Sequence, residues 1–192
     1  MSDFWLYFNH GFHYVVNWNA YAIILFLIVL CTAQDFSAWK KLLVLVTVFT
    51  LGHTISSLLG IYNIVQVSSS LIAFLIPVTI LFMALFNLFS AGKGKKVKKT
   101  GILYIIAAFF GMINGLGFVP SFQEIGANIE FLSLLQFELG VEVGQIVVRI
   151  IILILAFIFQ SIFRFNKRDW ILVVSSIVIG ILIPMFIDSW IF

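Results

Sequence analysis

Six long apolar runs, separated by short polar segments, account for most of this chain. They lie near residues 17–33, 42–61, 69–89, 101–118, 139–163 and 170–192. A helix needs about 20 apolar residues to cross a bilayer, and the first run reaches that length only if its helix begins near Asn17 or earlier. The pattern therefore predicts an all-α fold, a polytopic transmembrane bundle of about six spans forming a single domain over residues 1–192.

The composition supports a membrane protein. The chain is 62% hydrophobic and 10% charged, whereas roughly a quarter of the residues in soluble domains are charged. The polar segments between the runs are too short to form a separate soluble catalytic domain. Cys31 is the only cysteine, so an intramolecular disulfide or a thiolate metal cluster within one chain is excluded.

Basic residues are distributed very unevenly and predict the orientation. Ten of the eleven Lys and Arg residues fall in three connections, which contain Lys40 and Lys41, the lysines of 93–99, and the basic residues of 164–168. With six spans these connections share one side, which the positive-inside rule makes cytoplasmic, and both termini lie outside. The run "KGKKVKK" favours contact with anionic lipids of the bilayer, and we expect no nucleic-acid partner.

The fifth run carries an unusual series of polar side chains. Glu138, Glu142, Gln145 and Arg149 follow one another at spacings of four, three and four, which places them on one helical face. Glu138 is near the outer end of the predicted span and is expected at the interface. The others are expected to face the bundle interior, because charge near the bilayer centre is costly unless it has a partner or water. A structural pair and a functional site are equally compatible with this pattern.

Two other runs supply polar residues to the same interior. The second contains "FTLGHTISSLLG", in which Thr50, His53 and Ser57 share a face, and the fourth contains "FFGMINGLGF", in which Asn114 lies between two glycines. An imidazole can bind a metal ion or form a hydrogen bond to a neighbouring helix. If His53 shares a cavity with Glu142, the imidazole and carboxylate together suit a borderline divalent cation.

These segments, with "FELGVEVGQ" at 137–145 as the most specific piece, resemble the HupE/UreJ family of small bacterial membrane proteins. The resemblance covers most of the chain and implies a permease for nickel or cobalt, or an accessory protein, in the bacterial inner membrane. It suggests His53, Glu142 and His13 as metal ligands, with Ni²⁺ or Co²⁺ as the transported ion.

The chain departs from the family pattern at several expected ligand positions. Ala22 and Ile23 occupy the place of an Asp-His pair, Tyr14 that of an earlier histidine, and Asn114 that of a histidine in the fourth span. Because a fold can be inherited without its chemistry, these replacements leave open whether metal binding is retained.

Two functional hypotheses follow. The first is a transporter-like protein whose polar cavity is lined by Thr50, Ser57, Asn114, Gln145 and Arg149. The second is an accessory protein whose buried polar network is structural and which binds a membrane-protein partner or forms a homo-oligomer. An enzyme is not expected, since the sequence offers no nucleophile motif, and Asp3, His10 and His13 are a weak metal-site pattern.

Overall fold

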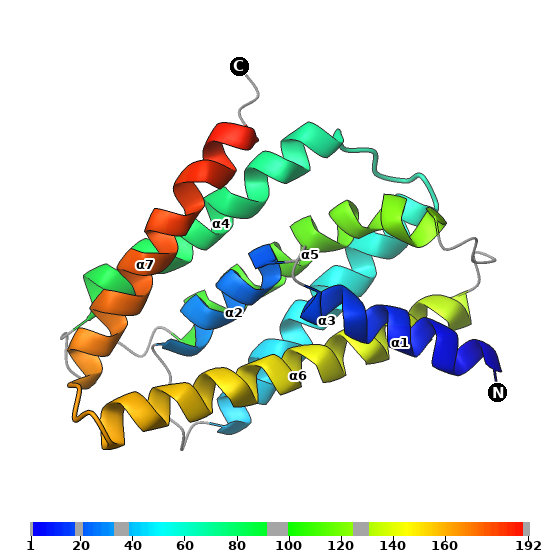
Figure 1. Cartoon of the computed structure of the whole chain (residues 1–192). Coiled ribbons are helices and arrows are strands. Elements are labelled where there is room, and N and C mark those ends of the chain that lie inside the picture. The colour runs from blue at the N-terminus through cyan, green and yellow to red at the C-terminus, as the bar shows by residue number, and fades with distance from the viewer. Residues whose placement is uncertain (1, 18–20, 33–38, 92–99, 125–130, 190–192) are drawn as a thin grey trace.

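The computed structural model describes residues 2–17, 21–32, 39–91, 100–124 and 131–189. Helices are the regular structure of these segments, which confirms the all-α prediction (Figure 1). The lysines of 93–99 and small parts of the first and last predicted spans lie outside the described residues. The helices are α1 (Ser2–Val16), α2 (Tyr21–Thr32), α3 (Trp39–Ile61), α4 (Ser69–Ser90), α5 (Thr100–Glu124), α6 (Phe131–Ser161) and α7 (Lys167–Asp188).

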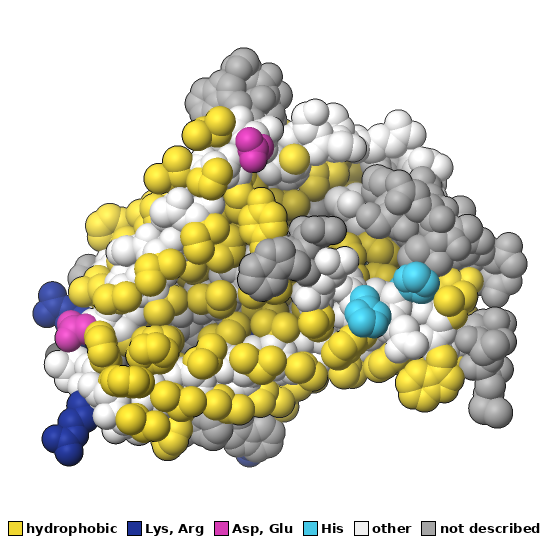
Figure 2. All heavy atoms as spheres, in the orientation of Figure 1, with side chains coloured by type: hydrophobic (Ala, Val, Ile, Leu, Met, Phe, Trp, Pro, Cys, Tyr) yellow, Lys and Arg dark blue, Asp and Glu magenta, His cyan; other side chains and the backbone are white. Residues whose placement is uncertain are grey.

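Within the described part of the chain, five helices, α3 to α7, are long and apolar enough to cross a membrane. Helices α1 and α2 pass the same test together, with a bend of 68° between them, so the number of spans is six when this bent pair is counted as one. Large apolar side chains cover much of the visible surface (Figure 2). A lipid environment explains this exposure, because soluble monomers rarely carry apolar patches of such extent. The protein is an integral membrane protein.

Two helix bounds differ from the sequence prediction. α6 begins at Phe131, eight residues before the predicted span, so Glu138 lies two turns inside the helix. In place of the single helix that was expected to begin near Asn17 or earlier, the structure has two helices: α1 ends at Val16 and α2 begins at Tyr21. The first difference follows from the apolar residues that precede Glu138, which continue the helical pattern outward.

Helices α1 and α6 pack with their backbones in direct contact. A Cβ atom at Gly11 would collide with the carbonyl oxygen of Phe137, and one at Gly140 would collide with that of Phe8. Only glycine permits this approach. Because lipid supplies no hydrophobic driving force between helices, such close packing is a main source of their association.

Helices α3 and α5 form a second pair of the same kind. A Cβ atom at Gly111 on α5 would collide with the carbonyl oxygen of Phe49, and one at Gly115 would collide with that of His53. On α3, Gly52 meets the backbone of Ala108 in the same way. The glycines of "FFGMINGLGF" therefore fix the height and rotation of α5 against the helix that carries His53.

Helix α2 lies inside the bundle, between α6 on one side and α4 and α7 on the other (Figure 1). Phe26, Leu27 and Leu30 are fully buried. The side-chain amide of Asn87 on α4 donates a hydrogen bond of 2.7 Å to the carbonyl oxygen of Val29. This bond ties α4 to α2 in an otherwise apolar contact.

Candidate functional site

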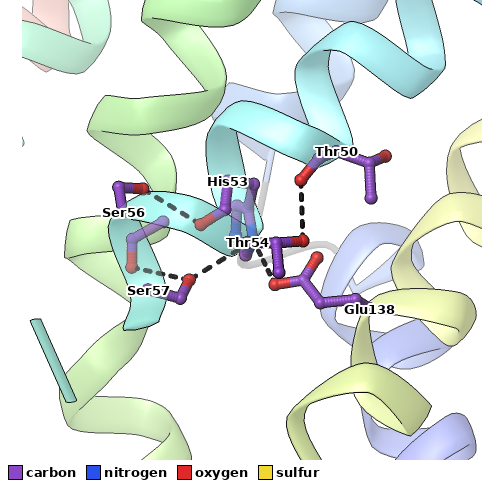
Figure 3. Close-up of polar contacts among 7 residues, drawn as sticks. Thr50, His53, Thr54, Ser56, Ser57 and Glu138 are labelled. Carbon is purple, nitrogen blue, oxygen red and sulfur yellow. Dashed lines mark hydrogen bonds and ion pairs between the residues drawn. The ribbon is translucent and has the colours of Figure 1, made fainter. Parts of the chain in front are cut away.

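The two close-packed helix pairs meet at a buried histidine and a buried glutamate. His53 Nδ1 on α3 lies 2.7 Å from Glu138 Oε1 on α6 (Figure 3). The His53 side chain is fully buried and that of Glu138 is 4% exposed. Charged or polar groups in such surroundings are costly unless they are paired, so each side chain provides the partner that the other needs where the two helix pairs meet.

The position of the proton on the His53 ring decides which of its nitrogens can bind a metal ion. An ionised carboxylate can only accept a hydrogen bond, so with Glu138 in this form Nδ1 is the protonated nitrogen and donates to Glu138. In a neutral imidazole, Nε2 then keeps its lone pair. Among the described residues, neither His53 Nε2 nor Glu138 Oε2 has a hydrogen-bond partner.

Hydroxyl groups of α3 surround the same histidine. Ser57 Oγ lies 3.5 Å from His53 Nδ1 and donates a hydrogen bond of 3.2 Å to the carbonyl oxygen of Gly115 on α5. Ser56 Oγ donates to the carbonyl oxygen of His53 at 3.0 Å (Figure 3). These bonds hold the α3 backbone at the site and connect it to α5.

Aromatic rings enclose the pair. The ring centroids of Phe49, Phe118 and Tyr14 lie 6.0, 5.7 and 6.2 Å from that of His53. Phe118 also stacks on Phe137, the residue before Glu138, with 4.2 Å between the ring centroids. The rings come from α1, α3, α5 and α6, and they make the surroundings of the pair apolar, which strengthens its electrostatic attraction.

The polar face of α6 continues past Glu138. Gln145 is fully buried, and neither its amide nitrogen nor its amide oxygen has a hydrogen-bond partner among the described residues. Arg149, one turn further, is 3% exposed and lies within electrostatic range of Cys31 and Glu142. Glu138, Gln145 and Arg149 project within about 20° of one line along the helix, so the buried polar stripe follows α6 through the bundle.

The remaining predicted residues lie in different environments. Glu142 is half-buried, on the same side of α6 as the stripe but rotated from it, and the acidic partner of His53 is Glu138 instead. Asn114 is buried, and its amide donates to the carbonyl oxygen of Phe110 on its own helix at 2.9 Å. The Thr50 hydroxyl is buried without a hydrogen-bond partner in the described part of the chain.

His13 does not join His53. It is exposed on α1, while the following residue, Tyr14, points inward to His53. The described residues contain no group of three or more His, Cys, Asp or Glu side chains that could hold a metal ion. A pocket of about 380 Å³ lies elsewhere, between the α3–α4 connection and the ends of α4 and α5 that adjoin it, and it is lined by none of the predicted cavity residues.

Sequence reasoning placed Glu138 at the interface and thereby missed the partner of His53. One signal was present in the helical spacing. Residues 138, 145 and 149 lie close to one line along the helix, and residue 142 lies farther from that line. The apolar residues from Phe131 onward were not included in the span, so Glu138 was assigned to its end.

Comparison with known proteins identifies the family. The family model described as HupE / UreJ protein matches residues 1–189. The chain belongs to the HupE/UreJ family. No curated protein and no solved structure matches it. Membership in a family of membrane-bound, permease-like or accessory proteins agrees with the apolar helices.

Proposed function

We propose that this HupE/UreJ protein is a permease for a divalent cation of the nickel and cobalt class, and that His53 is the residue that binds the ion during passage. The observation that carries the proposal is the 2.7 Å contact between His53 Nδ1 and Glu138 Oε1. With Glu138 ionised, the proton is on Nδ1, and Nε2 is left as a metal-binding atom in the bundle interior.

This arrangement has the form of a metal-binding histidine whose second nitrogen is held by a carboxylate. Such carboxylate partners orient the ring and raise the basicity of the ligating nitrogen. Imidazole nitrogen suits Ni²⁺ and Co²⁺. Here Glu138 is chiefly a positioning residue, and water would complete the coordination of the ion.

A small number of protein ligands favours transport over storage. An ion must bind well enough to enter and weakly enough to leave. One donor atom from the protein, with water completing the coordination, meets the second condition better than a closed set of four or six protein ligands. The buried stripe of Gln145 and Arg149 continues along α6 from the His53 level and supplies polar groups deeper in the bundle.

Nickel and cobalt uptake in cells without their own transporters tests the proposal. We expect uptake above the empty-vector level for the unmodified protein and none for His53→Ala. Glu138→Gln should lower uptake by about 10- to 100-fold, as loss of a carboxylate behind a ligating histidine does. Glu142→Gln is the matched control, because it changes a glutamate one turn away that does not contact His53.

The amount of each variant in the membrane must be measured alongside uptake. Uptake by His53→Ala equal to that of the unmodified protein would overturn the proposal. If Glu142→Gln lowered uptake more than Glu138→Gln did, Glu142 rather than Glu138 would be the acidic residue that acts with His53 in transport.

A second function is favoured by one observation: the described residues hold no group of three or more metal-ligating side chains. In that case the His53–Glu138 pair joins the two helix pairs structurally, and the protein is an accessory that binds another membrane protein or a second copy of itself. A stable complex in lipid, together with no cation flux into proteoliposomes, would establish this function instead.

A further inference from the structure

Two histidines lie together on the outward face of α1. His10 and His13 are both exposed, whereas Gly11 and Val15, on the opposite face of the helix, are buried. Figure 2 shows histidine side chains next to each other on the surface, over the position that α1 occupies in Figure 1. The pair is distinct from the interior His53.

The spacing of the pair suits chelation. Residues three apart on a helix have Cβ atoms about 5–6 Å from each other, so both imidazole rings can turn toward one ion. Imidazole nitrogen binds Ni²⁺, Co²⁺, Cu²⁺ and Zn²⁺, and the two rings leave the other coordination positions to water.

The opposite face of α1 holds this helix rigidly in place. Gly11 lies against the carbonyl oxygen of Phe137, and Gly140 lies against that of Phe8, so the α1 backbone around the histidines is fixed to α6. A fixed backbone reduces the ordering cost that two ligands on a flexible segment would incur on binding an ion.

The histidines contrast with the rest of the exposed surface. Many large side chains exposed on this protein are apolar, as lipid contact requires, whereas His10 and His13 are polar. Asn17 continues the same exposed face one turn beyond His13. The face of α1 that points away from α6 is therefore a polar stripe in an apolar surface.

We propose that His10 and His13 form a surface binding site for a borderline divalent transition-metal ion. The site adjoins the interior one along the chain: His13 points outward, and Tyr14, the next residue, is in ring contact with His53. A role as the first docking point of a transported ion rests on the proposed function, but binding of the metal at the surface does not.

Calorimetric titration of the tag-free full chain in lipid nanodiscs with Ni²⁺ tests the site. We expect a binding event that persists in His53→Ala. It should weaken about a hundredfold or more when His10→Ala or His13→Ala removes one of two tethered ligands. The same measurement on His13→Ala combined with Leu6→His, which restores a histidine one turn from His10, should recover most of the affinity.

Electron paramagnetic resonance with Cu²⁺ gives a readout other than affinity, because two coordinated imidazoles produce nitrogen hyperfine structure. Ni²⁺ binding unchanged in the double variant His10→Ala/His13→Ala would overturn the proposal. Binding that depends on His10 and His13 in a protein without nickel uptake would support the surface site while overturning the proposed transport.

Discussion

His53 on α3 and Glu138 on α6 are 85 residues apart in the chain, and their side chains meet at 2.7 Å in the bundle interior. Each belongs to a different close-packed helix pair. The contact is therefore both a polar centre and a tie between two halves of the fold.

Removing the Glu138 carboxylate should destabilise the protein. Glu138→Ala removes the 2.7 Å partner of the buried His53 Nδ1 and leaves the Ser57 hydroxyl at 3.5 Å, which should cost about 1–3 kcal/mol. Glu138→Gln keeps an acceptor oxygen and should cost less. Unfolding midpoints in detergent measure the difference. Glu142→Gln is the control and should change the midpoint little, because Glu142 is half-buried and is not the partner of His53. Equal effects at 138 and 142 would contradict the pairing.

A methyl group at Gly140 should disrupt the packing of α1 on α6. The added Cβ of Gly140→Ala would meet the Phe8 carbonyl oxygen, which belongs to a backbone that cannot turn aside. Overpacking of this kind costs about 1–3 kcal/mol. We expect a lower unfolding midpoint and faster proteolysis of the α1 segment.

Gly180→Ala is the matched control for that substitution. No atom lies within 4 Å of a Cβ built at Gly180, so alanine should leave stability unchanged or raise it by up to about 1 kcal/mol through helix propensity. A similar loss of stability in both variants would show that the effect does not come from the α1–α6 contact.

The hydrogen bond from Asn87 to Val29 should contribute measurably to the packing of α4 on α2. Its loss in Asn87→Ala should cost about 0.6–2 kcal/mol, the range for interhelical hydrogen bonds in membranes. Thr47→Ala provides a comparison, because the exposed Thr47 hydroxyl donates a hydrogen bond within its own helix, to the carbonyl oxygen of Leu43. An unfolding midpoint for Asn87→Ala no lower than that for Thr47→Ala would refute the contribution.

The orientation in the membrane can be measured with single cysteines. The α3–α4 and α6–α7 connections lie at opposite ends of the bundle (Figure 1). In a Cys31→Ser background, Gln66→Cys should react with an impermeant maleimide in intact cells, because that connection is predicted to be outside. Asn166→Cys should react only after permeabilisation. The reverse labelling pattern would invert the predicted topology.

The apolar runs alone were sufficient to predict the helices. Within a bilayer, a long apolar segment must satisfy its own backbone hydrogen bonds, so it becomes a helix whatever its neighbours are. For this reason α3, α4 and α7 lie close to their predicted ranges. Helical periodicity likewise showed that Gln145 and Arg149 share a face, and both are buried.

Which side chains meet across helices was decided only by the tertiary structure. Periodicity gives the face of a residue but not the helix that faces it, and the height of one helix against another depends on where glycines allow the backbones to touch. Gly111 and Gly115 set α5 against α3, and Gly11 and Gly140 set α1 against α6. Those contacts bring Glu138, rather than Glu142, to His53 and turn His13 outward. The sequence by itself determined the helices and their polar faces, and backbone packing between distant segments determined the site.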